Sequence, residues 1–300
     1  MTEDETSTSD YSNTAQSDLS IRLRSARVLQ RLSQGLVGKA GPFHLVVSPL
    51  RAVFDGMALG LLRRSDVEDM VAETYQASPS FYDPRRYQLS HETKMLPTLQ
   101  RLAGERTELL DAFCGQGREA EVFARAGFDV TAIDRCGWMI DAAKIYAEEL
   151  DFATDFLVAD FASFQRDTPF EVVYTSLWMY STVQGSENRA SFLKQCRALT
   201  NADGLVVISC VGSIADSRFT KAIRFVFAKI VGCLTLGNPK CEWGERIYSG
   251  LFWHHRSDRS LRREVSAAGF RVVESIHGQG TDPWFYFLTP SDEDSEASGE

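Results

Sequence analysis

The sequence lacks any pair of cysteines with the spacing of a metal site. It holds six cysteines but no Cys-x-x-Cys, and the closest two, Cys233 and Cys241, are eight positions apart. Structural zinc sites and iron–sulfur clusters need closely spaced thiolates, so the sequence offers no motif for either. The first residues also lack the charged-then-apolar order of a secretion signal. Free thiols and no such signal lead us to expect a cytoplasmic protein.

A long uninterrupted apolar run is missing as well. The nearest approach is the stretch 44–62, which Pro49, Arg51 and Asp55 interrupt. A helix that crosses a bilayer needs about 20 consecutive, mostly apolar residues. We therefore expect no membrane-spanning segment.

Basic charge is scarce, because 41 acidic residues outnumber 32 Lys and Arg and give a net charge of −9. Residues 1–20 carry −5 and residues 291–300 carry another −5, so the body between them is close to neutral at +1. A surface that binds duplex nucleic acid needs a broad basic excess, so nucleic acid is not the expected partner. Both ends are rich in Ser, Thr and acids and are expected to be disordered tails.

What the chain does have is a strand, a tight turn and a helix between Thr107 and Ala126. An apolar run ends near Asp111, Gly115 and Gly117 follow, and a helical pattern then begins. Glycines let the backbone pass close to a ligand, and the helix points its free N–H groups at the same place. The next strand, 128–134, ends in Asp134, an acid that can accept from both ribose hydroxyls. This unit predicts a nucleotide-binding site.

Three successive predicted strands end in Asp111, Asp134 and Asp160. In a parallel sheet the carboxyl ends of the strands meet at one edge, where ligands bind. The pattern Gly115, Gly117 and Ala120 also fits a dinucleotide site, and an NAD-binding Rossmann protein is the alternative. However, a carboxylate at Asp111 would repel a pyrophosphate, whereas it suits a ligand with a cationic amino group.

The stretch from Asp111 to Gly117 resembles the glycine-rich motif of the class I S-adenosylmethionine-dependent methyltransferases. The resemblance covers roughly 108–289 and implies an α/β fold with a Rossmann-like seven-stranded, mostly parallel sheet and a terminal antiparallel hairpin. It implies S-adenosylmethionine as cofactor. The residues that it assigns to cofactor binding are Asp111, Ala112, Phe113, Gly115, Gly117, Asp134, Arg135, Met139, Asp160, Phe161, Ser176 and Leu177.

The loop after the fourth predicted strand, 170–177, indicates the acceptor class. Family members that methylate base or glutamine amines usually carry Asn/Asp-Pro-Pro-Tyr here, whereas this chain has Ser176-Leu177-Trp178. Phe113 favours a nucleic-acid acceptor instead, because some nucleic-acid enzymes of the family have phenylalanine at this position, where small-molecule members more often have glycine. We weight the loop more and expect a small or lipophilic acceptor, with an O, N or S nucleophile left open. A nucleic-acid methyltransferase and a non-catalytic S-adenosylmethionine-binding partner protein stay as alternatives.

The remaining segments predict a helical extension and an insertion. Amphipathic helices are expected over 21–36, 49–62, 65–75 and 85–102, so 21–106 forms an N-terminal cap before a methyltransferase domain over 107–290. Residues 212–250 contain an apolar helix and are expected to form a lid over the acceptor. For 21–36 we favour packing of Ile21, Val28, Leu29, Leu32 and Leu36 on the domain over contact with a membrane.

The sequence offers four candidates for a general base. A hydroxyl acceptor needs one, and the available imidazoles are His254, His255 and His91, with Tyr180 in the acceptor loop as a further candidate. In many members of the family a tyrosine-bearing segment before the first strand folds over the cofactor, and the resemblance makes Tyr82, Tyr87 and His91 candidates for that role by position alone. No metal site and no oligomeric state are indicated.

Overall fold

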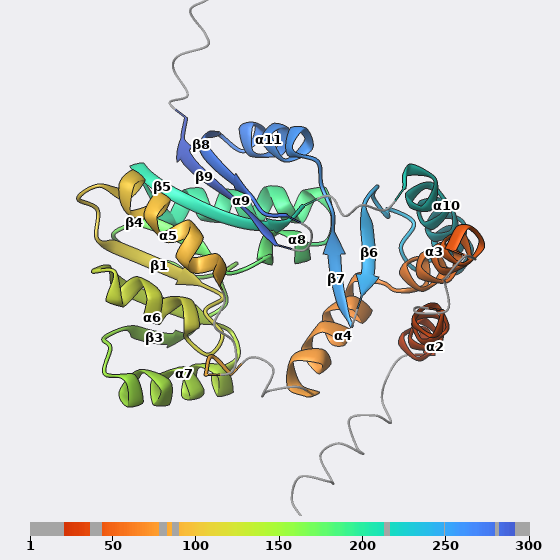
Figure 1. Cartoon of the computed structure of the whole chain (residues 1–300), viewed down its shortest axis with the longest axis horizontal. Helices are drawn as coiled ribbons and strands as arrows, with labels where there is room; N and C mark the ends of the chain where they lie inside the picture. Colours follow the sequence, from red (N-terminus) through yellow and green to blue (C-terminus); the bar gives the residue numbers. More distant parts are fainter. Residues whose placement is uncertain are drawn as a thin grey trace, which may run out of the picture. The chain divides into compact units, whose positions relative to one another are not determined.

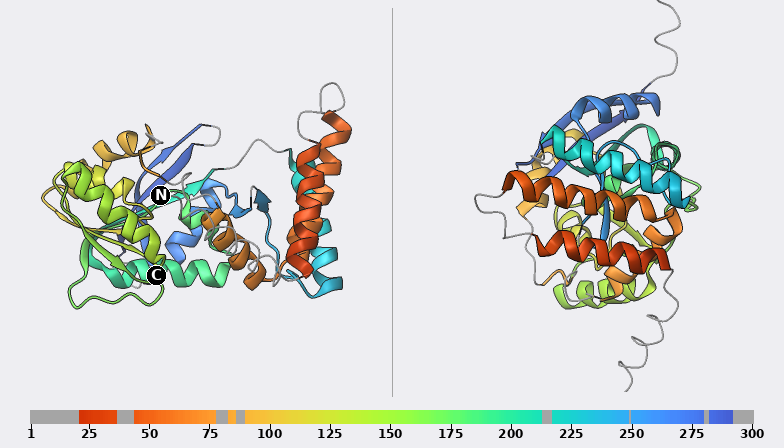
Figure 2. Two further views of the ribbon diagram at one scale, coloured as in Figure 1. Left: turned by 90° about the horizontal axis from the view of Figure 1, so that it is seen from below. Right: turned by 90° about the vertical axis from the view of Figure 1, so that its right-hand side faces the viewer.

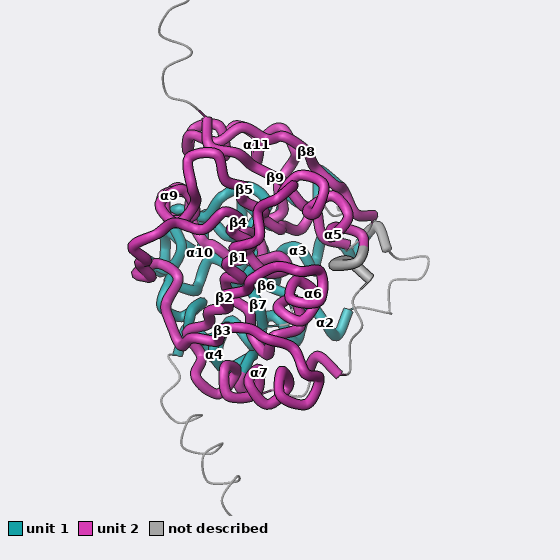
Figure 3. Tube along the Cα trace, turned by 90° about the vertical axis from the view of Figure 1, so that its left-hand side faces the viewer, with its two compact units in different colours: residues 1–75, 216–252 teal, residues 76–215, 253–300 magenta. Residues whose placement is uncertain are grey.

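The computed structural model describes residues 21–36, 44–77, 83–85, 90–212, 217–248, 250–279 and 282–291. The predicted tails, apart from residue 291, lie outside this range, as do Tyr82 and Tyr87. The chain divides into two compact units, the first made of 1–75 and 216–252 and the second of 76–215 and 253–300 (Figure 3). The division therefore lies near residue 75, whereas the sequence suggested residue 106.

The second unit is built on a seven-stranded sheet with the order β3-β2-β1-β4-β5-β9-β8 (Figure 1). The first five strands in the chain pair in parallel, and β9 joins β5 and β8 in antiparallel fashion. This topology confirms the predicted Rossmann-like sheet with a terminal antiparallel hairpin. The strands are β1 (Glu108–Ala112), β2 (Asp129–Asp134), β3 (Asp155–Val158), β4 (Phe170–Thr175), β5 (Thr200–Val211), β8 (Phe270–His277) and β9 (Pro283–Pro290).

Helices cover both faces of this sheet. Side chains alternate across the strands, so that Leu109 faces one apolar core and Leu110 the other. The first core is closed by α5 (Ser90–Ala103), α6 (Arg118–Arg125) and α7 (Gly137–Leu150). The second is closed by α8 (Met179–Thr182), α9 (Ser186–Leu199) and α11 (Asp258–Ala267). A sheet buried on both faces explains the nearly continuous apolar runs of its central strands.

The first unit is mainly helical. It contains α2 (Ile21–Gly35), α3 (His44–Leu61), α4 (Arg64–Ala77) and α10 (Arg218–Thr235). A two-stranded sheet joins β6 (Glu245–Tyr248) and β7 (Leu251–His254), and the sequence did not predict this hairpin. The N-terminal helices and the inserted helix thus share one core, which includes Leu59, Met70 and Ala228. The lid role of 212–250 stays a prediction.

The packing predicted for α2 is only partly correct, because Leu29 packs against the core of the first unit but three of the other predicted residues do not. The buried side chains of α2 are Leu23, Ala26, Gln30 and Ser33, whereas Ile21, Val28 and Leu32 are exposed by 81%, 55% and 50%. The side of α2 that carries Leu23 and Ala26 lies in the core of the first unit, beside α3, and the three exposed apolar residues lie outside it. Arg22 strengthens the contact by donating to the carbonyl oxygens of Leu61 and Thr235, at the ends of α3 and α10.

Glycines set the distance between α3 and α10. A Cβ atom at Gly60 would lie 2.5 Å from the carbonyl oxygen of Ala228, and one at Gly56 would lie 2.4 Å from that of Arg224. Gly60 also faces Gly232, so small residues meet small residues along this contact. None of the described helices is both long and apolar enough to cross a membrane.

Replacing Gly60 with alanine should destabilise the protein, because the new methyl group must displace backbone of α10. We expect Gly60→Ala to lower the free energy of unfolding by about 1–3 kcal/mol. Denaturant unfolding of the full chain measures this. Gly35→Ala is the control, since nothing lies within 4 Å of a Cβ there. Equal stability of Gly60→Ala and wild type would contradict the tight packing.

Candidate active site at the carboxyl edge of the sheet

The three predicted acids lie at the carboxyl ends of three adjacent strands. Asp111 pairs with Ala132 across β1 and β2, and its side chain is fully buried. Asp134 is the last residue of β2, and its carbonyl oxygen accepts from the N–H of Ala159 at 3.0 Å. The third strand ends at Val158, earlier than predicted, so Asp160 lies in the turn beyond it and is exposed. The edge therefore gathers these residues as expected, with Asp160 on a loop.

The turn after β1 takes the backbone shape that its glycines allow. Gly117 has φ +84° and caps α6. A Cβ atom there would lie 3.1 Å from the ring of Phe156 and 3.2 Å from Ala143, so both conformation and space favour glycine. At Gly115 the sulfur of Met139 lies 3.8 Å from the position of a Cβ atom. Met139, a predicted site residue, therefore borders the turn.

The carboxylate of Asp134 joins two loops. Its Oδ2 accepts from the N–H of Gly115 at 3.0 Å, and its Oδ1 accepts from the N–H of Cys136 at 2.8 Å. Burial raises the pKa of Asp134, while these two amide bonds and the exposed Arg135 oppose the rise. Each carboxylate oxygen has two acceptor positions, so both oxygens can still accept from a ribose hydroxyl.

Phe113 stands at a position that needs glycine-like freedom. Its φ is +65°, an uncommon conformation for a residue with a side chain. Its ring lies 5.0 Å from that of Phe161 and 6.0 Å from that of Phe192, between ring centres. This aromatic packing holds the strained backbone in place. Phe161 is only 4% exposed, so most of its surface is used in this cluster.

Glu119 is a member of the site that sequence reasoning missed. Its side chain is 2% exposed, and its Oε1 accepts from the hydroxyl of Ser176 at 3.1 Å and pairs with Arg118 at 3.2 Å. Ser176 in turn donates its N–H to the carbonyl oxygen of Ala112 at 3.0 Å. The available signal was an acid in the first turn of a helix, where the helix dipole favours negative charge.

The carboxylates converge on Cys114. Burial, together with the negative charges of Asp111, Asp134 and Glu119, raises the pKa of its thiol. Cys114 is therefore a neutral, unreactive filler of the turn. All three of these acids therefore lie near enough to the turn to act on the Cys114 thiol.

The loop after β4 is held by polar contacts of its backbone. Leu177 is buried in the core, and Trp178 adopts a left-handed φ of +61°. The N–H of Trp178 donates to the hydroxyl of Ser209 at 3.1 Å, and its ring meets that of Trp253 edge to face at 6.0 Å. Aromatic surface is thus available beside Ser176.

Of the proposed bases, Tyr180 has a structural role. It is fully buried, its hydroxyl donates to Glu264 at 2.7 Å, and burial raises its pKa. Glu264 also accepts from Arg189 at 3.0 Å and from Arg256. The pKa of Tyr180 lies far above neutrality, so this hydroxyl is not a base at physiological pH.

The histidines differ in their surroundings. His254 is 4% exposed, and its Nδ1 lies 3.2 Å from Arg256. The Nδ1 of half-buried His255 lies 3.0 Å from the carbonyl oxygen of Gly212, just beyond the end of β5. A carbonyl oxygen only accepts, so Nδ1 carries the proton and Nε2 is the basic nitrogen of neutral His255. The side chain of His91 lies outside the described residues.

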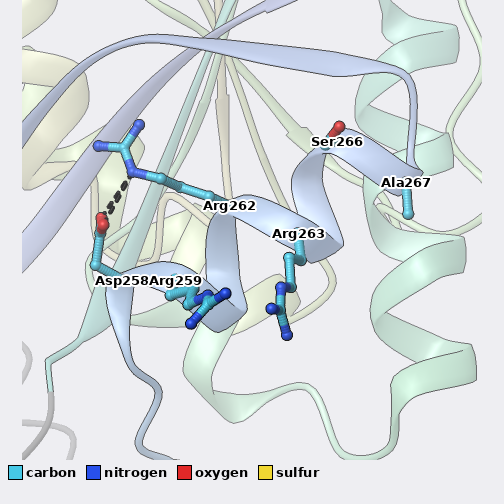
Figure 4. A pocket seen from close by; sticks show the side chains of 6 residues that line it. All are labelled: Asp258, Arg259, Arg262, Arg263, Ser266 and Ala267. Atoms are coloured by element: carbon cyan, nitrogen blue, oxygen red, sulfur yellow. Dashed lines mark hydrogen bonds and ion pairs between the residues drawn. The ribbon is translucent and has the colours of Figure 1, made fainter.

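A surface recess elsewhere is unrelated to this edge. It is lined by Asp258, Arg259, Arg262, Arg263, Ser266 and Ala267, all on α11 (Figure 4). Arg262 pairs with Asp258 at 3.0 Å across it. The core-facing side chains of α11 are Leu261 and Val265, so the recess lies on the solvent side of the helix.

A model of the family described as "Methyltransferase domain" matches residues 85–275, which is more than half of the chain. The chain belongs to this methyltransferase family. Among curated proteins, a ubiquinone biosynthesis O-methyltransferase of Rickettsia typhi is 29% identical over 130 residues. Its homologue in Rickettsia felis is 30% identical over 130 residues. The matches cover 43% of this chain, which spans about half the length of these relatives, 48% and 49%.

Solved methyltransferases share the fold. The 1,6-didemethyltoxoflavin-N1-methyltransferase of Burkholderia thailandensis aligns with a TM-score of 0.53 and 16% identity, over 75% of this chain and 87% of that one. An S-adenosylmethionine-dependent methyltransferase of Clostridium acetobutylicum aligns with a TM-score of 0.52 and 9% identity, over 73% and 99%. The methyltransferase thus keeps its sheet at very low sequence identity.

The bridge made by Asp134 predicts a measurable loosening of the glycine turn. In Asp134→Ala, the N–H groups of Gly115 and Cys136 lose their acceptor. We expect their hydrogen exchange to become roughly tenfold faster or more, because a charge-assisted bond is lost. Asp129→Ala, at the exposed start of the same strand, is the control. Unchanged exchange at Gly115 in Asp134→Ala would show that the carboxylate does not hold the turn.

Proposed function

We propose that the protein binds S-adenosylmethionine at the carboxyl edge of its sheet and transfers the methyl group to a small or lipophilic acceptor. The observation that carries the proposal is the Asp134 carboxylate, which joins the glycine turn to the next loop and keeps acceptor positions for a ribose. Membership of the methyltransferase family supports it. The residues that would hold the cofactor are those of the turn, together with Asp111, Asp134 and Met139.

Charge favours this cofactor over a dinucleotide. Asp111 and Glu119 are buried beside the turn, and no described basic side chain is as deeply buried there. A pyrophosphate would meet repulsion from these carboxylates. A ligand with an ammonium and a sulfonium group gains from the same charges, because buried electrostatic interactions are weakly screened.

The acceptor is proposed from the loop after β4 and from the relatives. The loop lacks the proline pair that holds base and glutamine amines, and it places Trp178 against Trp253. The curated relatives are ubiquinone biosynthesis O-methyltransferases, and the Burkholderia structure contains 1,6-didemethyltoxoflavin. Ubiquinone is a lipophilic ring compound and 1,6-didemethyltoxoflavin is a small one, so we propose a small or lipophilic acceptor that contains a ring, with its identity open.

Transfer places modest demands on the protein. When bound, S-adenosylmethionine would supply an activated methyl group on its sulfonium, with a neutral thioether as the leaving group. The chain must hold the nucleophile in line and exclude water. For a hydroxyl acceptor we propose that His255 receives the proton on Nε2, since its Nδ1 is held by Gly212. A thiol or amine acceptor has no need of that base.

We also propose a reducing, cytoplasmic location. All six cysteines are free thiols, and four of them, Cys114, Cys196, Cys210 and Cys241, are buried. Burial raises the pKa of each of these four thiols, which keeps them protonated and slow to oxidise.

Calorimetric titration with S-adenosylhomocysteine tests the cofactor. Asp134→Asn should weaken binding by about 1.5–3 kcal/mol, the range for hydrogen bonds to a charged group. Asp129→Asn should bind as wild type does, and NAD should not bind. Binding of NAD with no response to S-adenosylhomocysteine would reject the assignment. Turnover of a panel of phenols, thiols and amines separates an enzyme from a non-catalytic binder.

A further inference from the structure

The first unit exposes an unusual amount of apolar surface on three helices. Nine of the sixteen large apolar side chains that are exposed among the described residues lie on α2, α3 and α10. The three helices lie side by side, with α3 between the other two (Figure 2). The exposed residues are Ile21, Val28, Leu32, Val46, Leu50, Phe219, Val226, Ile230 and Leu234. We call them the apolar stripes.

The stripes follow helical spacing. On α10, Val226, Ile230 and Leu234 are four residues apart, and Phe219 precedes them by seven, so all four share one side of the helix. The buried residues Ala228 and Gly232 lie on the opposite side. Four large apolar side chains of α10 therefore face solvent, although Phe225 on the same helix packs against the core of this unit.

Close contacts between the helices accompany these exposed side chains. Gly56 and Gly60 of α3 meet backbone atoms of α10, together with the Cβ atoms of Phe227 and Val231, so the two helices approach closely. Helix pairs that pack through small residues leave their large apolar side chains pointing outward, as helices do in lipid. Exposed apolar side chains therefore recur along these helices and are not confined to single residues.

Basic charge accompanies the stripes. Helix α2 carries four Arg, α10 carries two Arg and two Lys, and neither has an acid, while α3 carries one Arg and one Asp. The three helices together carry a formal charge of +8 in a chain whose net charge is −9, although Arg27 pairs with Glu73 of α4 and Arg224 is buried beside Asp55. Arg24 and Arg31 are exposed on α2 beside Val28, and Arg218 is exposed beside Phe219. Apolar and cationic groups are therefore interleaved.

We propose that α2, α3 and α10 dock onto the surface of a bilayer that contains anionic lipid. Apolar side chains enter the boundary of the acyl chains, and basic side chains meet the negative headgroups. A second copy of the chain fits the surface poorly, because it would bring another +8 against the first. The inference is independent of the methyl acceptor and holds for any substrate.

Co-sedimentation of the full-length protein with vesicles tests the proposal. Vesicles of phosphatidylcholine with 30% phosphatidylglycerol, by our design, should pellet the protein, whereas pure phosphatidylcholine should pellet far less. Binding should weaken as salt rises from about 50 to 500 mM, because the electrostatic part is screened. Equal binding to both vesicles, or none to either, overturns the proposal.

Variants separate the two contributions. Phe219→Ser with Ile230→Ser should reduce partitioning roughly tenfold or more by removing buried apolar area. Arg31→Gln with Arg218→Gln should reduce it roughly 25-fold, at about fivefold per charge. Ile145→Ser with Leu150→Ser is the matched control, since these exposed apolar residues lie on α7 of the other unit. The control should bind as wild type does.

Two further outcomes count against the proposal. An equal loss of binding in the control pair would indicate nonspecific hydrophobic adsorption to the vesicles through any exposed apolar side chain. A dimer in sedimentation equilibrium that Phe219→Ser with Ile230→Ser dissociates would assign the stripes to a second copy instead. Circular dichroism of each variant verifies that it is folded.

Discussion

The hydrogen bonds from Gly115 and Cys136 to one carboxylate determine the shape of the active edge. Asp134 is placed at the end of β2 by the sheet, and its two oxygens fix the loops that follow β1 and β2. The glycine turn can then adopt its left-handed backbone, and α6 can begin at Arg118 with Glu119 turned inward. The N–H of Cys114 also donates to the carbonyl oxygen of Ile133 in β2 at 3.0 Å, so the carboxylate adds to a backbone bond between the turn and that strand.

The two units differ in how their secondary-structure elements pack together. In the second unit, large apolar side chains fill two cores on either side of a sheet. In the first, a core that includes Leu59 and Met70 is combined with close contacts between α3 and α10 at glycines, and nine large apolar side chains stay exposed. The sheet edge of the second unit carries the residues of the proposed cofactor site. The exposed apolar side chains of the first unit form the surface for which we propose a bilayer.

Much of the fold of the second unit can be predicted from the sequence, because the patterns that mark its strands and its glycine turn lie within short stretches of the chain. Apolar runs ending in Asp111 and Asp134, with Gly115 and Gly117 between them, are enough to predict two parallel strands and the turn. Glu119 was missed because its burial depends on Ser176, a residue 57 positions later. The strain at Phe113 was also hidden, since the rings that hold it come from Phe161 and Phe192. Such long-range contacts leave no periodic pattern in the sequence.

The failure on α2 has a different cause. Hydrophobic periodicity locates the helix correctly but assumes that the largest apolar side chains face the core. On α2 the side that carries Leu23, Ala26, Gln30 and Ser33 is buried instead, which leaves Ile21, Val28 and Leu32 exposed. The most direct test of the central claim is a crystal structure of the protein with S-adenosylhomocysteine. The account predicts both ribose hydroxyls within hydrogen-bonding distance of Asp134, with the ligand's amino group near Asp111 and Glu119. A ligand bound elsewhere, or a ribose without contact to Asp134, would contradict it.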